Sequence, residues 1–164
     1  MRYILIDKIT EMVLGQSLKG FKNVTHSDAL GRNSGKDRTP LPAAFVMESM
    51  AQAAGLLVAL TVDCKAQPVL AKVQKMKMYE RVKAGDQIEV FAAMEDIQEA
   101  GARLFVSSSI DGFPLAEATV FLSLVSFESL ENGNATEHRR TLQRAIAGLA
   151  PEWFSQPQEE RTEI

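Results

Sequence analysis

The feature that most limits the possible folds is a long, nearly uncharged segment between residues 39 and 62. It is interrupted by Pro40, Pro42, Glu48 and Gln52. Because proline is tolerated in the first turn of a helix, Pro42 predicts a helix that runs from about Ala43 to Leu60. The interruptions are more typical of a buried helix than of a membrane span. A helix that is hydrophobic nearly all round has to be enclosed by other elements of the fold.

Short β-prone segments lie on both sides of this helix, separated by turn signals such as Asp111-Gly112. Two are expected before the helix and four after it, over residues 2–7, 17–24, 68–80, 87–94, 103–110 and 115–127. This order predicts an α+β domain in which a curved antiparallel sheet wraps around one long central helix. The edges of such a sheet invite pairing with a second copy, so we expect a dimer or a higher homo-oligomer.

The C-terminal part of the chain differs from the rest. We expect a single domain over residues 1–130, an appended helix within 131–154 and a frayed polar tail over 155–164. Thr136 is a candidate cap for the helix, which should run to about Ala147, with Gly148 and Pro151 ending it. Leu142, Ile146 and Leu149 would share one side of this helix, and Trp153 and Phe154 would dock on the rest of the protein.

Composition excludes several classes of function. The chain has 164 residues and a net charge of −3, with no basic block that could neutralise the phosphates of a nucleic acid. Cys64 is the single cysteine, which rules out an internal disulfide and a cysteine metal cluster. Residues 1–10 carry charges and lack the unbroken apolar core of a signal peptide. We therefore expect a cytoplasmic protein with no membrane or nucleic-acid partner, no metal and no cofactor.

Two polar side chains stand out in the apolar helix. Glu48 and Gln52 are four residues apart and share one helix face. An unpaired buried carboxylate is costly, which makes Glu48 a candidate for chemistry. Alternatively, this face meets solvent or a structural partner such as a lysine. The helix alone leaves both interpretations open.

Several motifs point to a known family when their order is considered. They are RYILIDKIT, GFKNVT, PLPAAFVMESMAQAAG, KMKMYERVKAGDQIEV and the last strand, and together they cover about residues 1–127. The strongest is the helix with Glu48 and Gln52, combined with the turn Ala84-Gly85-Asp86. In this order the motifs resemble the bacterial 3-hydroxyacyl-acyl-carrier-protein dehydratases, which have the hotdog fold. The resemblance implies a dimer that binds an acyl chain in a tunnel between subunits.

The resemblance also implies a substrate and a set of site residues. The acyl chain would arrive as a thioester on an acyl carrier protein or coenzyme A, in fatty-acid or polyketide biosynthesis. Dehydration needs a base for the C2 proton, an acid for the C3 hydroxyl and donors for the thioester oxygen. By resemblance, Glu48 is the acid, Gln52 orients groups near it, and the backbone N–H of Ala43 is an oxyanion donor. Pro42, Phe45 and Met47 would contact the substrate.

The histidine that serves these dehydratases as a base has no counterpart at its expected position. In the family it lies fourteen positions before the acid, and here that position is Ser34. A serine hydroxyl is not appreciably ionised near neutral pH without a neighbouring base. The two histidines of the chain are His26 and His138, and neither lies at the position of the family's histidine. Asp37 is a candidate substitute for the histidine, although its carboxylate would be a weaker base in this reaction.

Three functions therefore stay open at this point. The first is a dehydratase that has found another base. The second is a non-catalytic acyl-binding homologue, which could form a heterodimer with a related subunit that carries the histidine. The third is a thioesterase in which Glu48 alone activates water.

Overall fold

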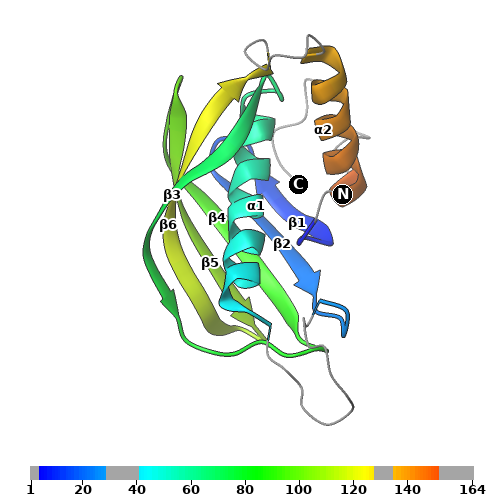
Figure 1. The fold of residues 1–164 in the computed structure, drawn as a ribbon, viewed down its shortest axis with the longest axis vertical. Coiled ribbons are helices and arrows are strands. Elements are labelled where there is room, and N and C mark those ends of the chain that lie inside the picture. Colours follow the sequence, from blue (N-terminus) through cyan, green and yellow to red (C-terminus); the bar gives the residue numbers. More distant parts are fainter. Residues whose placement is uncertain (1–3, 29–40, 128–134, 152–164) are drawn as a thin grey trace.

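The computed structural model describes residues 4–28, 41–127 and 135–151. In chain order the elements are β1 (Lys8–Val13), β2 (Ser17–Asn23), α1 (Ala43–Thr61), β3 (Ala66–Met78), β4 (Gln87–Gln98), β5 (Gly101–Ile110), β6 (Phe113–Ser126) and α2 (Ala135–Leu149). The strands form one antiparallel sheet in the order β1-β2-β4-β5-β6-β3. Figure 1 shows this sheet curving around α1. The predicted hotdog arrangement is confirmed.

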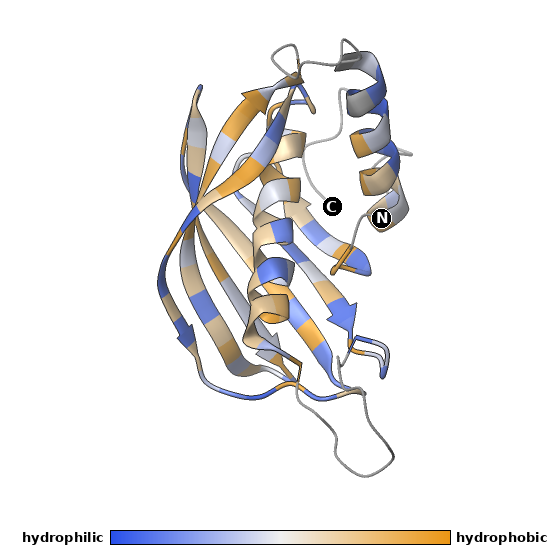
Figure 2. Ribbon diagram, viewed as in Figure 1, coloured by the Kyte–Doolittle hydropathy of each residue, from blue (hydrophilic) through white to orange (hydrophobic). Residues whose placement is uncertain are grey.

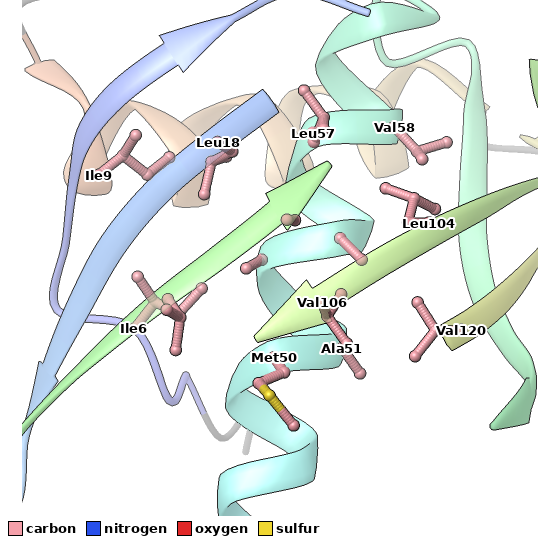
Figure 3. Packing of buried hydrophobic residues seen from close by; sticks show 14 of the residues in the cluster. Ile6, Ile9, Leu18, Met50, Ala51, Leu57, Val58, Leu104, Val106 and Val120 are labelled. Carbon is pink, nitrogen blue, oxygen red and sulfur yellow. The ribbon is translucent and has the colours of Figure 1, made fainter. Parts of the chain in front are cut away.

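Enclosure by the sheet accounts for the apolar character of α1. Figure 3 shows Met50, Leu57 and Val58 of α1 packed among side chains of the sheet, including Leu104 and Val106. By length and composition α1 could cross a membrane, but 61% of its most apolar window is buried inside the protein. The core helix of a globular domain has the same properties. Figure 2 shows α1 mainly in the colours of apolar residues, with a few hydrophilic bands.

The expected strand over residues 2–7 is wrong for the part of it that is described. Residues 4–7 precede β1, which begins at Lys8. Leu5 and Ile6 are buried in spite of this, with 4% and 1% of their surface exposed. A short apolar run indicates that a segment is buried, but burial alone does not distinguish a strand from an irregular segment that packs on the core.

The two edges of the sheet are β1 and β3. β3 is largely exposed, and it carries apolar side chains into solvent at Val69, Leu70 and Met76. An exposed edge strand with apolar side chains is able to pair with another strand.

The C-terminal helix is longer than expected. It begins at Ala135, so that Thr136 lies inside it, and it continues through Gly148 to Leu149. The shared side of the helix is confirmed, because Leu142, Ile146 and Leu149 are all buried. Figure 2 shows one polar and one apolar side along α2. The residues for which we predicted docking, a frayed tail and a domain boundary (Trp153, Phe154, residues 155–164 and the region near residue 130) lie outside the described residues.

Gly20 lies where the backbones of β1 and β2 come close together. A Cβ added to Gly20 would lie 2.6 Å from the backbone oxygen of Lys8, next to an irregularity in β1 between Ile9 and Glu11. We expect Gly20→Ala to lower the free energy of unfolding by about 1–3 kcal/mol, because the backbone has to move. Urea unfolding followed by circular dichroism measures this.

Gly148→Ala is the matched control for this substitution. A Cβ there meets nothing within 4 Å, and the residue is helical. Relief of the glycine penalty should raise stability by about 0.5–1 kcal/mol. If both variants had the same unfolding midpoint, the close approach at Gly20 would be contradicted.

Candidate active site

Helix α1 places Glu48 and Gln52 one turn apart and joins them by a hydrogen bond. The amide Nε2 of Gln52 donates to Oε1 of Glu48 over 3.0 Å. The amide oxygen of Gln52 accepts from the backbone N–H of Leu5 over 2.8 Å. Gln52 therefore links the carboxylate of Glu48 to the irregular N-terminal segment, and it holds one of the carboxylate oxygens in place.

The carboxylate of Glu48 is not enclosed within one chain. Glu48 is exposed and Gln52 is half-buried. Among the described residues, no lysine or arginine forms an ion pair with Glu48. The carboxylate thus meets solvent in a single chain, and the amide of Gln52 is its hydrogen-bond partner.

Beside this pair lies a cavity of about 320 Å³. The volume is at the lower end of the range for small-molecule sites. The α1 side of the cavity is formed by Glu48, Ala51, Gln52, Gly55, Leu56 and Ala59. The remaining walls come from Ile4, from Gln67, Pro68 and Leu70 of β3, from Leu122 of β6, and from Leu142, Ala145 and Leu149 of α2.

The lining has a polar end at Glu48 and Gln52, and the rest of it is apolar except for Gln67 of β3. Glu48 is the single titratable side chain among the described lining residues. The small residues Ala51, Gly55 and Ala59 leave space along α1, and a Cβ added at Gly55 would meet nothing within 4 Å. An acid–base group at one end of an apolar cavity suits a ligand with a polar head and an aliphatic tail.

The other predicted contact residues lie elsewhere. Pro42 caps α1 without a side-chain hydrogen bond, and Ala43 is the first helical residue; both are exposed. They line a separate hollow of about 650 Å³ next to residues 78–81. Met47 is part of the buried core, and Phe45 packs against it. The structure does not bring these four residues into the cavity with Glu48.

The position of the family's histidine, Ser34 in this chain, is not among the described residues. Ser34 and Asp37 lie within residues 29–40, which the structure leaves out, and nothing is described of the His138 side chain. His26 is exposed in a turn over residues 26–28 that follows β2. That turn is tied to β2, since Lys22 Nζ lies 3.4 Å from the carboxylate of Asp28. The role of Ser34 stays a prediction.

Asp28 shows how firmly this turn is fixed. Burial acts to raise the pKa of Asp28, but hydrogen bonds from Thr25 and the positive charge of Lys22 outweigh it, and the pKa lies below its ordinary value. The side chain of Thr25 donates to Asp28 over 2.7 Å. The carboxylate is therefore charged at neutral pH, and it holds the turn over residues 26–28 against β2.

Sequence reasoning missed the walls that come from outside α1. The apolar stripe Leu142, Ala145 and Leu149 was visible at helical spacing, but nothing in the sequence indicated which surface it faces.

Among the described residues there is no group of three or more histidine, cysteine, aspartate or glutamate side chains that could hold a metal.

Comparison with known proteins decides the family. No protein-family model matches the chain. The 3-hydroxyacyl-[acyl-carrier-protein] dehydratase FabZ of Gluconacetobacter diazotrophicus is 31% identical over 120 residues, which cover 71% of this chain and 74% of that protein. The chain belongs to the FabZ family. The FabZ of Nitratidesulfovibrio vulgaris is 25% identical over 131 residues, covering 78% of this chain and 85% of the relative.

Solved structures agree with the FabZ assignment at the level of the fold. A protein of Streptococcus mutans UA159, solved bound to acetyl CoA, superposes with a TM-score of 0.61 and covers 77% of this chain and 94% of its own. The two sequences are 12% identical, so the likeness establishes the shared fold alone. The enzyme family and the fold are thus fixed independently of each other.

The hydrogen bond from the backbone N–H of Leu5 to Gln52 can be tested by measuring the free energy of unfolding. We expect Gln52→Ala to lower the free energy of unfolding by about 1–3 kcal/mol, because the buried N–H of Leu5 loses its acceptor. Urea unfolding measures the change. Glu48→Gln is the control and should stay within about 0.5 kcal/mol of the parent, since Glu48 is exposed. Equal stability of Gln52→Ala and the parent would contradict the link.

Proposed function

We propose that this protein acts on 3-hydroxyacyl thioesters, carried on an acyl carrier protein or coenzyme A, and eliminates water to give the 2-enoyl thioester. The observation that carries the proposal is the carboxylate of Glu48, which Gln52 holds at the polar end of an apolar cavity in a member of the FabZ family. The apolar walls suit an acyl tail, and the polar end suits the hydroxyl and thioester groups.

In this reaction the C2–H and C3–O bonds break and a C2–C3 double bond forms. Glu48 in its protonated form gives a proton to the departing hydroxyl, which leaves as water. The proton would come from Oε2, because Gln52 engages Oε1. Gln52 acts as a positioning residue that keeps the carboxyl group directed while the substrate binds. The backbone N–H of Ala43, which the resemblance implies as the donor to the thioester oxygen, is not assigned a part in this step, because Ala43 lines a separate hollow and not the cavity beside Glu48.

A second subunit would complete the site. β3 is an exposed edge with apolar side chains, and Pro68 and Leu70 of the same strand line the cavity. Pairing along β3 would therefore bury Val69 and Leu70 and close the cavity wall at the same time. We propose that the base comes from this second subunit, either from another copy or from a related chain that carries the histidine. In the second case the present chain contributes Glu48 to a heterodimer.

One observation favours a second candidate function. Glu48 is the single titratable side chain among the described residues that line the cavity. A lone carboxylate can act as a general base toward water, which then attacks the thioester carbonyl; the thiol leaves and a free acid forms. Hydrolysis needs no histidine and would use the same cavity.

Mass spectrometry of the products separates these functions. Purified protein is incubated with 3-hydroxyacyl thioesters of several lengths, each on a carrier protein and on pantetheine. Loss of water supports the dehydratase, and release of free acid supports the hydrolase. Intact substrate at every length would contradict both activities of the isolated chain, and the experiment would then be repeated with a histidine-bearing relative added.

Glu48→Gln tests the central residue. Since a general acid or base contributes about 10²–10⁴-fold, turnover should fall by that factor or become undetectable, while the oligomeric state stays that of the parent. Initial rates and size-exclusion chromatography measure the two properties. Glu99→Gln, at an exposed position in the turn between β4 and β5, is the matched control and should turn over substrate as the parent does. Unchanged activity of Glu48→Gln would remove Glu48 from the mechanism.

A further inference from the structure

Helix α2 contacts the turn that follows α1 through one exposed ion pair, and its apolar side joins the core of the domain. Arg139 Nη2 lies 2.6 Å from the carboxylate of Asp63 and donates to its backbone oxygen over 3.1 Å. Asp63 has a left-handed backbone with φ of 52°, just beyond the end of α1. Ile146 is fully buried and joins the same core as α1. The helix is thus an integral part of the domain.

From this anchor α2 runs antiparallel to α1 and apart from it (Figure 1), and it packs on β1. Because Arg139 contacts the end of α1, Leu142 lies nearer to that end and Leu149 nearer to the half of α1 that carries Glu48. Both side chains line the cavity, and Ala145 lines it between them. α2 therefore supplies a wall of the cavity that faces the apolar stretch of α1.

The cavity is long in the direction of α1. Its α1 lining runs from Glu48 to Ala59, about 16 Å at the helical rise of about 1.5 Å per residue. The titratable group lies at the Glu48 end, and the far part is bounded by Leu56 and Ala59 of α1 and by Leu142 of α2, with Gln67 and Pro68 at the start of β3. An aliphatic tail whose polar head lies at Glu48 would extend into this far part, between the two helices.

Ala145 is the smallest side chain that α2 contributes to the cavity. It is half-buried, with larger leucines one turn away on either side. A methyl group at this position leaves open the space that a larger side chain would fill. Among the side chains that α2 contributes to the lining, this is therefore the one whose enlargement would shorten the cavity most.

We propose that α2 sets the length of the acyl chain that this protein accepts, and that Ala145 is the specificity-determining residue. The inference rests on the proposed function, because it assigns the cavity to an acyl tail. It predicts that larger side chains at position 145 exclude long tails and leave short ones unaffected. Glu48 and Gln52 are separate from α2, so the chemistry and the chain length are controlled by different elements.

The test uses non-reactive ligands, so that binding is measured independently of turnover. Thioether analogues of acyl-pantetheine with saturated tails of increasing length are titrated calorimetrically into the full chain. For the parent, the affinity should rise about fourfold per methylene and then level off when the cavity is full. Ala145→Phe should level off at shorter tails with unchanged affinity for the shortest, and Ala145→Leu should lie between the two.

Ala147→Phe is the matched control. It makes the same change on α2 at a residue outside the cavity lining, and its profile should be that of the parent. An unchanged limit in both Ala145 variants would overturn the inference, as would a uniform loss of affinity at all lengths. If Ala145→Phe does not fold, the comparison of Ala145→Leu with the parent decides.

The proposed function and this inference fail separately. If the parent converts no 3-hydroxyacyl thioester but binds the analogues with a limit that Ala145→Phe shortens, the dehydration is wrong and the role of α2 stands. If the parent eliminates water and the limit is the same in every variant, the role of α2 is wrong and the dehydration stands. Failure of the parent to bind any analogue overturns the inference.

Discussion

The enclosure of α1 by a curved sheet is the constraint on which the other features depend. Burying this helix removes a large apolar surface from water, and the sheet has to curve to achieve it. One side of the helix nevertheless faces a cavity and not closely packed side chains, and there the sequence changes to Glu48, Gln52 and small residues. The candidate site is located where the enclosure is incomplete, which explains why a polar pair is tolerated on so apolar a helix.

The parts of the fold that the sequence predicted are those governed by local rules. The helix from Ala43 was found because Pro42 and the apolar run both mark it, and the hairpin at Asp111-Gly112 because its backbone needs positive φ at both residues. The strand predicted over Leu5 and Ile6 was wrong because these side chains are apolar where the segment packs on the core, and these residues are not part of a strand. Their surroundings are set by contacts far along the chain, and a local pattern does not contain them.

The same division applies to the candidate site. The spacing of Glu48 and Gln52 was enough to place them on one face, since an α-helix fixes that geometry. The acceptor role of Gln52 toward Leu5 joins residues 47 positions apart, and the wall from α2 joins residues even further apart. Such pairings depend on how the elements pack, so an amphipathic stripe such as Leu142, Ala145 and Leu149 identifies a buried face without identifying its neighbour.

The hydrogen bond from Leu5 to Gln52 has a practical consequence for anyone who handles this protein. Ile4 lines the cavity and Leu5 holds the amide that positions the carboxylate, so the chain enters the domain directly beside the candidate site. An affinity tag or fusion partner joined ahead of Ile4 would be tethered next to that opening. Leu149, near the end of the described residues, lines the same cavity, so a tag joined on either side of the domain is best cleaved off before any assay.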